Sequence, residues 1–288
     1  MPPAVTLVDF AAHLRDWDLR PDGAPFATHA ARLLPVRWRG VPAILKLSDD
    51  EDERRGARLL RWWDGDGAAR VLAGDGRALL LERATGAGDL SAMARGGLDD
   101  EACRILCAVA ARLHGPRRGP EPSLVPLSHW FQELRPVAAA QGGILRHCAA
   151  AARHLLDSPR DIRVLHGDLH HGNVLDFGSQ GWLAIDPKGL LGERGFDFAN
   201  IFTNPDLADA SHPVATAPDR FARRLVVVAE TAGLERRRLL LWILAWAGLS
   251  AVWFLQDGQE ARIDFRIAEQ AIAALEMGRG REDGLPGP

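Results

Sequence analysis

Alternating apolar and polar positions predict a small antiparallel sheet near the start of the chain. The runs at 31–38 and 41–48 have β-like patterns and are joined by Arg39-Gly40, which indicates a hairpin. The runs at 69–74 and 77–83 flank Asp75-Gly76, a dipeptide typical of a tight hairpin turn. We therefore expect two hairpins in this region.

Helical patterns surround and separate these hairpins. The segment LVDFAAHLRDW, residues 7–17, predicts a short helix before the first hairpin. Ser48 and Glu51 have the spacing of a capping box, and acidic residues fill the turn that follows. We expect a helix from there to about Trp63, between the two hairpins.

A glycine-rich joint, ATGAGDLS, follows Arg83, and the pattern then becomes mainly helical. Helices are predicted at 99–113, 128–140 and 144–157, and again from Phe196 to about Gly278. Short strands are predicted at 163–168, 173–177 and 182–187. The fold class is therefore α+β: a β-rich lobe with one main helix (1–83) and a larger helical lobe (84–288). A cleft between two lobes is a natural ligand site.

Residues 239–255 form an uncharged apolar stretch that raises the question of a membrane. Its length falls just short of the roughly 20 residues that a span needs, and Gly248 and Ser250 interrupt it. We therefore favour a buried core helix, and we expect no membrane association.

Composition and charge exclude several classes of protein. A net charge of −3 does not favour binding to nucleic acid. Cys103, Cys107 and Cys148 form no recognisable clip, and no basic and apolar leader is evident, so we expect a reduced, cytoplasmic monomer. Lys46 and Lys188 are the only lysines among 35 lysines and arginines, which makes the position of each informative.

The segment HGDLHHGN, residues 166–173, carries the clearest chemical signal. His166, Asp168, Leu169 and Asn173 match the kinase catalytic loop H-R-D-L-x-x-x-N in place. In that loop a carboxylate accepts the proton of the attacking hydroxyl, and an amide oxygen five residues later holds a magnesium ion. We predict Asp168 as the general base and Asn173 as a metal ligand.

A second carboxylate is needed for magnesium, and two candidates follow. Asp176 lies in the letters D-F-G, but it ends the outgoing strand, roughly 10 Å from Asn173 at about 3.3 Å per residue. The returning strand, WLAID, brings Asp186 back towards the start of the hairpin. We predict that Asp186 is the metal ligand and that Asp176 forms the turn.

Lys46 lies near the end of a predicted strand in AILKL, which is similar to the V-A-I-K element whose lysine contacts ATP phosphates. Glu51 and Glu53 follow on the next helix, and we choose Glu53 as its partner. Lys188 is two residues past Asp186, where it could reach a phosphate or the acceptor, or could lie at the surface. His166 is expected to hold the loop by a hydrogen bond.

The glycine-rich loop of protein kinases has no counterpart before Lys46, so any phosphate-covering loop must be of another kind. By position alone, the backbone near Glu82 and Ala84 is expected to bind adenine.

Together these segments resemble the aminoglycoside phosphotransferases, and within them the streptomycin 6-phosphotransferase group of antibiotic resistance kinases. The resemblance rests on VLHGDLHHGNVLDFG, GWLAIDPKGLLGERGFDFANIF, AILKL and LSAVWFLQDG, and extends with gaps from about residue 24 to 270. It implies a protein-kinase-like fold, ATP and Mg²⁺ as cofactors, and phosphorylation of a small-molecule hydroxyl group. It implies the same roles for Asp168, Asn173, Asp186 and Lys46, and a bracing role for Asp197. By the same resemblance, Gly56 falls at a position where some relatives carry the glutamate that pairs with the lysine.

A streptomycin-like acceptor is a polycation with guanidino groups, so its pocket should be acidic. Candidates for this pocket are Glu193, Asp197, Asp257 and Glu260, with Trp253 as an apolar wall. A surface or helix-capping charge is the alternative interpretation of each acidic residue.

Three other functions remain open from the sequence. The histidines around Asp168 superficially resemble a zinc-hydrolase loop, although their order is wrong and only the isolated His212 follows. A non-catalytic nucleotide-binding module is the second alternative. The third keeps the kinase and replaces the acceptor by another sugar, an amino alcohol or a host metabolite.

Overall fold

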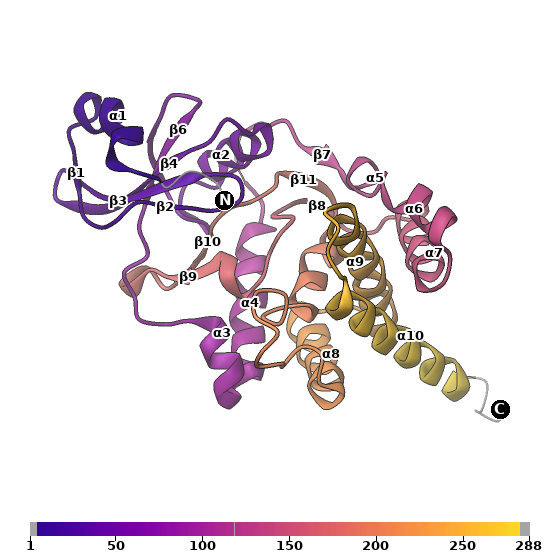
Figure 1. Ribbon diagram of the computed structural model, residues 1–288. Helices are drawn as coiled ribbons and strands as arrows, with labels where there is room; N and C mark the ends of the chain where they lie inside the picture. The colour runs from indigo at the N-terminus through magenta and orange to yellow at the C-terminus, as the bar shows by residue number, and fades with distance from the viewer. Residues whose placement is uncertain (1–4, 118, 283–288) are drawn as a thin grey trace.

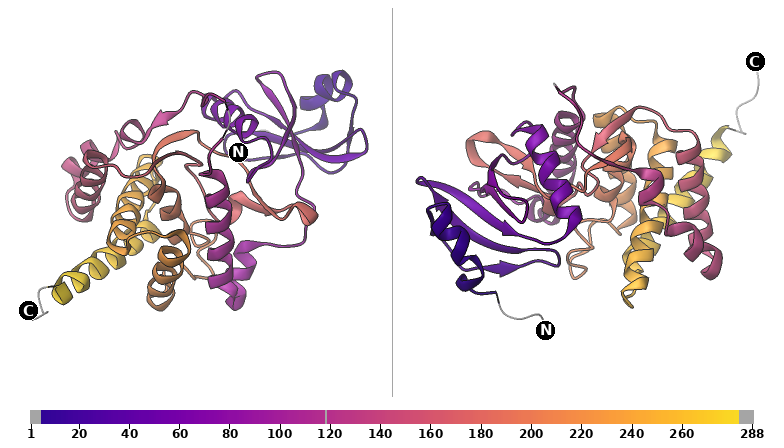
Figure 2. Two further views of the ribbon diagram at one scale, coloured as in Figure 1. Left: turned by 180° about the vertical axis from the view of Figure 1, so that it is seen from behind. Right: turned by 90° about the horizontal axis from the view of Figure 1, so that it is seen from above.

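The computed structural model describes residues 5–117 and 119–282. An antiparallel sheet with two helices lies at one end of the molecule, and a larger group of helices lies at the other (Figure 1). The segment 83–89, which carries no helix or strand, connects the two parts. Figure 2 shows the same separation from behind and from above. A division at residue 83 remains a prediction.

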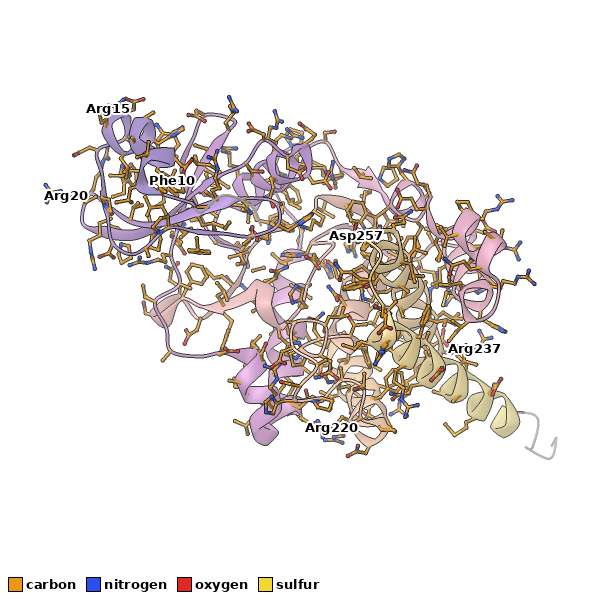
Figure 3. All side chains as sticks on the ribbon, viewed as in Figure 1. Phe10, Arg15, Arg20, Arg220, Arg237 and Asp257 are labelled. Carbon is orange, nitrogen blue, oxygen red and sulfur yellow. The ribbon has the colours of Figure 1, made fainter. Side chains whose placement is uncertain are left out.

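The first part is built on a sheet with strand order β1-β3-β4-β6-β5, and β2 pairs with β3. Leu34, Leu45 and Leu80 are fully buried on three neighbouring strands, and Phe10 packs with them. Figure 3 labels Phe10 beside the sheet. Both predicted hairpins are present. The strands are Leu19–Pro21 (β1), Phe26–Ala27 (β2), Arg32–Trp38 (β3), Val41–Leu47 (β4), Val71–Gly74 (β5) and Ala78–Glu82 (β6).

Helix α2 (Glu51–Trp63) begins where expected, but Asp50 caps it rather than Ser48. The Asp50 side chain accepts from the Asp52 N–H at 2.8 Å, whereas the Ser48 hydroxyl donates to the Ala30 carbonyl. The predicted capping box is therefore wrong, because a nearer carboxylate satisfies the helix N-terminus. The predicted helix at 7–17 is present as a 3-10 turn, Leu7–Phe10 (η1), and α1 (Ala11–Asp16).

The second part contains most of the helices. Those predicted at 99–113 and 144–157 have these bounds in the structure, but the one predicted at 128–140 is broken at residues 131–133. The helices are Leu90–Met93 (α3), Ala94–Leu98 (η2, π-helical), Asp99–Leu113 (α4), Leu127–Trp130 (α5), Leu134–Gln141 (α6), Ile144–Asp157 (α7), Pro218–Ala232 (α8), Arg236–Gln256 (α9) and Arg262–Glu282 (α10).

Helix α9 lies among the other helices of this part (Figure 1). By length and composition it could cross a membrane, but 72% of its apolar window is buried inside the fold. Trp242, Ile243 and Leu249 belong to the largest apolar cluster. The predicted core helix is confirmed.

Short strands insert between these helices and carry the segments of interest. The pair Val174–Asp176 (β9) and Trp182–Ala184 (β10) forms the predicted hairpin. A second sheet has the order β7-β11-β8, with Val125–Pro126 (β7), Leu190–Glu193 (β11) and Ile162–Leu165 (β8). Strands β1, β2, β7 and β11 were not expected, because runs of two to four residues carry little periodicity.

The segment after β11 also differs from the prediction. Arg194–Phe202 is a 3-10 helix (η5), and α-helix resumes only at Pro218. Asp206 holds the intervening loop, because its carboxylate accepts from the N–H groups of Val214, Ala215 and Thr216 at 2.8–3.0 Å. Helical structure therefore does resume near Phe196, as predicted, but as a 3-10 helix followed by a loop rather than as α-helix. Two short 3-10 helices, His171–Asn173 (η3) and Gly178–Gln180 (η4), lie on either side of β9.

Candidate active site

The predicted catalytic loop starts at the end of β8, where the chain leaves the sheet. Gly167 has φ +86, a left-handed conformation, and a Cβ there would come within 2.8 Å of the Leu190 side chain. Only glycine fits this position well. The turn at Gly167 sends Asp168 away from the core, and its side chain remains partly exposed.

His166 and Asp197 hold this loop from two sides. The His166 Nδ1 accepts from the Asp168 N–H at 3.2 Å, so its Nε2–H donates to the Ile185 carbonyl at 2.8 Å. The Asp197 carboxylate accepts from the N–H groups of His166 and Gly167 at 2.9 and 2.8 Å. Burial disfavours the charge on Asp197, but these bonds and His114, whose Nε2 lies 2.8 Å away, lower its pKa below the ordinary value.

The two carboxylate oxygens of Asp168 have different partners. Oδ2 accepts from the Asn173 Nδ2 at 3.1 Å, and the Lys188 Nζ lies 4.0 Å from it. Oδ1 accepts from the Asn200 Nδ2 at 2.8 Å, and the His170 Nε2 lies 3.7 Å away. The carboxylate is therefore held from both sides while it remains accessible.

The β9–β10 hairpin separates Asp176 from Asp186. Asp176 pairs with Trp182 at the turn end, and Val174 pairs with Ala184 at the other end. The next residue, Ile185, donates its N–H to the Asn173 carbonyl at 2.9 Å, which places Asp186 beside Asn173. The Asp176 carboxylate instead accepts from the N–H groups of Gly178 and Gly88, at 2.8 and 3.0 Å.

Lys46 joins the sheet to this hairpin. Its Nζ lies 2.5 Å from the Glu53 Oε2 and 2.6 Å from the Asp186 Oδ1, and the residue is only 5% exposed. Burial opposes the ammonium charge, but Asp186 and Glu53 outweigh it and raise the pKa of Lys46. The structure thus places Glu53 against the lysine. A glutamate at Gly56 would not fit, because a Cβ there would approach the Pro187 carbonyl oxygen to 2.3 Å.

The segment proposed for adenine lies at the edge of β6. Glu82 ends this strand, opposite Ala43 of β4. Among the backbone and side-chain hydrogen bonds of the described residues, none has the Ala84 N–H as donor. The neighbouring Arg83 is tied to Asp22 by an ion pair of 2.5 Å. At this edge the Ala84 N–H is therefore a donor without a partner among the described residues, and the ion pair with Asp22 fixes the preceding residue, Arg83.

The structure separates the four predicted acidic acceptor residues. Glu193 is buried at the far end of β11, opposite Ile162, and its carboxylate accepts from Arg238, Trp242 and the Arg160 N–H. Both oxygens of Asp197 are bonded to the catalytic loop, as described above. The carboxylates of Glu193 and Asp197 therefore do not face an acceptor, because each is buried and already accepts hydrogen bonds from other groups of the protein. Asp257 is exposed at the end of α9 (Figure 3), and Glu260 is exposed and pairs with Arg262.

Trp253, by contrast, lines a cleft of about 490 Å³ that also contains Lys188. Trp130 packs edge-on against Trp253, with ring centroids 5.7 Å apart. Glu133 and His129 line the same cleft, and Glu133 forms no ion pair with a described cation. Lys188 lines this cleft and its Nζ lies 4.0 Å from the Asp168 carboxylate, so the cleft reaches the candidate base.

The histidines near Asp168 have no zinc-like arrangement. The ring nitrogens of His166 are bonded as described, and the His170 Nδ1 accepts from the Gly172 N–H at 3.1 Å. His212 is exposed, outside this loop, beside Asp209. Within the described residues, no group of three histidine, cysteine or acidic side chains could hold a metal ion.

Sequence reasoning missed Asn200, His114, Trp130 and Glu133. Asn200 lies three residues after Asp197 in GFDFAN, and that spacing puts two residues on one face of a 3-10 helix. It was the one signal available. The other three come from distant segments and reach the site only through tertiary packing.

Comparison with known proteins confirms the family that the sequence resembles. A family model described as aminoglycoside/hydroxyurea antibiotic resistance kinase matches residues 16–258. A streptomycin 3''-kinase of Klebsiella pneumoniae is 56% identical over 264 residues, covering 90% of this chain and 99% of that protein. A streptomycin 6-kinase of Streptomyces griseus is 34% identical over 281 residues, covering 90% and 85%.

Comparison with solved structures shows which fold the chain shares. A thermostable mutant of an aminoglycoside phosphotransferase, in complex with ADP and hygromycin B, matches with a TM-score of 0.63 and 14% identity. The match covers 91% of this chain and 97% of that one. The predicted kinase-like fold is confirmed.

Proposed function

The chain belongs to the aminoglycoside/hydroxyurea antibiotic resistance kinase family, and from this premise we propose that it transfers the γ-phosphoryl group of ATP to the 3''-hydroxyl of streptomycin. The observation that carries the proposal is 56% identity to a streptomycin 3''-kinase over nearly the full length of that protein. The streptomycin 6-kinase relative is 34% identical, so the 3'' position is favoured over the 6 position. We place the activity in the cytoplasm and assign it to the monomer.

The residues around Lys46 suit the donor. Asn173, just before β9, and Asp186, just after β10, offer an amide oxygen and a carboxylate oxygen, the hard ligands that Mg²⁺ prefers. When bound, ATP supplies the phosphoryl group and Mg²⁺ neutralises charge on its phosphates. Lys46 would exchange Asp186 for phosphate oxygens and keep Glu53 as its anchor. The backbone at Glu82 and Ala84 would hold the adenine.

Asp168 is the proposed general base. It would accept the proton of the attacking hydroxyl as the new phosphorus–oxygen bond forms. Lys188, with its Nζ 4.0 Å from the Asp168 carboxylate, would sit between base and acceptor and offset negative charge there. The opening of the acceptor cleft at this lysine supports that arrangement.

The cleft offers groups that bind a guanidino cation, although the cations Arg55 and Lys188 also line it and Arg55 pairs with Asp52 there. Glu133 offers a carboxylate, and the faces and edges of Trp130 and Trp253 form an aromatic wall. Guanidinium groups pair with carboxylates in a bidentate manner and stack on aromatic rings. These three residues, of which Trp253 was expected from the sequence, therefore support an aminoglycoside acceptor. Of the four acidic residues expected there, Glu193, Asp197 and Glu260 are already paired, and Asp257 is exposed at the end of α9.

A direct assay tests the proposal. Purified protein should convert streptomycin and ATP to ADP and a monophosphorylated product in the presence of Mg²⁺, with phosphorus–proton NMR placing the phosphate at the 3'' carbon. The Asp168→Asn variant should lose about 10²–10⁴-fold in kcat, the usual contribution of general base catalysis. A product phosphorylated at the 6 position would contradict the position, and no turnover of streptomycin would contradict the acceptor.

A further inference from the structure

The catalytic carboxylate has a partner that the mechanism above does not use. Asn200 donates its side-chain N–H to the Asp168 Oδ1 at 2.8 Å, and the residue is only 4% exposed. Within the proposed phosphotransfer, we propose that Asn200 is a positioning residue that fixes the orientation of the Asp168 carboxylate. It acts through Asp168 and not on the substrate.

The Asn200 amide is itself held in one orientation. Its Oδ1 accepts from the Thr203 hydroxyl at 3.0 Å and from the Asn204 Nδ2 at 2.9 Å. Two donors on the oxygen leave the NH₂ group facing Asp168. A lone asparagine on the surface could turn its amide, but this one would lose both bonds by doing so.

The ends of this chain of hydrogen bonds fix its direction. Trp246 can only donate, and its Nε1–H bonds to the Thr203 Oγ1 at 3.2 Å. The Thr203 hydroxyl hydrogen is therefore free to point to Asn200, where the side-chain Oδ1 at 3.0 Å is nearer than the backbone carbonyl at 3.2 Å. At the other end the ionised Asp168 can only accept. From indole to carboxylate, every donor meets an acceptor.

The backbone around Asn200 is equally constrained. Arg224 is fully buried, and its Nη1 donates to the carbonyl oxygens of Ile201 and Asn204 at 2.8 and 2.6 Å. Asp197, one 3-10 turn before Asn200, holds the N–H groups of the catalytic loop. The same helix, η5, thus fixes the backbone of the loop through Asp197 and the reactive side chain through Asn200.

Asn173 cannot replace this contact. It bonds to the other carboxylate oxygen, Oδ2, and its amide oxygen is the proposed metal ligand, so its position follows the metal. Asn200 lies on the opposite oxygen and depends only on the protein. Without it, the carboxylate could rotate about its Cβ–Cγ bond, and only a fraction of the molecules would present the base to the hydroxyl.

The test is a set of three variants measured for kcat, for KM of ATP and for thermal stability. Asn200→Asp keeps the size and the oxygen that accepts from Thr203, but replaces the donor that faces Asp168. Asn200→Ala removes the whole group. Both should lower kcat about 10- to 100-fold, the loss expected for a hydrogen bond to a charged group, while KM for ATP stays within about threefold.

Thr203→Val removes one of the two donors to the Asn200 amide oxygen, together with the acceptor of the Trp246 N–H, and should lower kcat less than the Asn200 variants do. Combined with Asn200→Ala, it should add nothing further, because its effect passes through Asn200. Thr216→Val is the matched control. It also deletes a threonine hydroxyl, which donates to Asp206 in the neighbouring loop, and should lower stability without changing kcat.

Several results would overturn the proposal. One is wild-type kcat in Asn200→Asp or Asn200→Ala. Another is a rise in KM for ATP that matches the fall in kcat, and a third is additivity of the Thr203 and Asn200 effects. If Asn200→Ala fails to fold, the kcat values of Asn200→Asp and Thr203→Val test the proposal in its place. If the wild type does not phosphorylate streptomycin, the proposed acceptor fails, and the same variants are compared by their hydrolysis of ATP with water as acceptor.

Discussion

At the scale of single residues, Asp264 is a carboxyl group that the chemistry of the cleft does not use. It lies fully buried in the first turns of α10, and neither of its oxygens has a hydrogen-bond partner among the described residues. Burial raises the pKa of Asp264 from 3.8 to about 7 and outweighs the opposite effect of the nearby Ser250 hydroxyl, which does not reach good hydrogen-bond geometry. The folded protein therefore keeps this group protonated at pH values where the unfolded chain has lost the proton.

This difference predicts a pH-dependent cost. Between about pH 4 and pH 7 the folded state binds one proton more than the unfolded state, so the contribution of Asp264 to the free energy of unfolding falls as pH rises and is constant above about 7. Relative to wild type, Asp264→Asn should gain about 2–4 kcal/mol between pH 4 and pH 8. Denaturant unfolding of both proteins across this range measures it, and a constant difference would contradict it.

The residues of the candidate site also show how far sequence reasoning reaches. Asp168, Asn173 and Asp186 could be selected because loop spacing and strand length place them relative to one another along the chain. Asp176 was set aside by the same argument, and the structure puts its carboxylate on the Gly178 and Gly88 N–H groups. Glu193 could not be judged, because only the fold brings Arg238 to it.

At the scale of elements, the segment between the two parts depends on close backbone contact. The Gly86 N–H donates to the Asp176 carbonyl at 2.9 Å, and the Gly88 N–H donates to its carboxylate. A Cβ on Gly86 would come within 2.0 Å of the Asp176 side chain. The hairpin that carries Asp186 is thus tied to the segment that carries the proposed adenine contacts.

Gly86→Ala should break this tie. We expect a loss of about 1–3 kcal/mol in the free energy of unfolding, as for other overpacked sites, and a several-fold rise in KM for ATP. Gly96→Ala is the matched control, since a Cβ there meets nothing within 4 Å; at this helical position it should leave KM for ATP unchanged and stabilise the protein by up to about 1 kcal/mol rather than destabilise it. Thermal unfolding and steady-state kinetics compare the two, and equal behaviour would show that the contact is unimportant.

The long helices could be predicted from the sequence, whereas the short strands and loops could not. Helices at 99–113 and 144–157 bury a continuous apolar stripe, which leaves a clear period in the sequence. Strands such as β11 have four residues, and the loop after Phe202 is shaped by Asp206 rather than by any local pattern. Their conformation is a consequence of partners that lie far away in sequence.

At the scale of the whole molecule, helix α2 rests directly on the segment that follows Asp186. The Arg55 Nε donates to the Lys188 carbonyl at 2.7 Å, and Gly56 leaves room for the Pro187 carbonyl. This packing brings Lys46 and Glu53 from the first part to Asp186 of the second. Leu59, Leu60 and Trp63 of α2 belong to the same apolar cluster as the C-terminal helices.

The Gly56→Ala variant distinguishes the local helix propensity from the tertiary packing, because the two predict changes of opposite sign in the free energy of unfolding. Alanine in a helix is favoured over glycine by about 1 kcal/mol, so a purely local effect would stabilise the protein. The close approach of the Pro187 carbonyl predicts destabilisation instead, together with a fall in kcat/KM for ATP as Glu53 and Asp186 move apart. Calorimetry and kinetics on this one variant distinguish the two outcomes, and a raised Tm with full activity would contradict the packing argument.

The sequence by itself determined the reaction class, the order of the chemical groups and the long helices. Those features depend on short-range spacing: five residues from Asp168 to Asn173, one hairpin from Asp176 to Asp186, and repeating apolar positions. Only the tertiary structure decided that Asn200 faces Asp168. It also decided that Glu193 forms a buried ion pair with Arg238. The same holds for the cleft that Trp130, Glu133 and Trp253 share. These contacts join segments from separate elements, and no local pattern encodes them because packing of the whole chain brings the segments together.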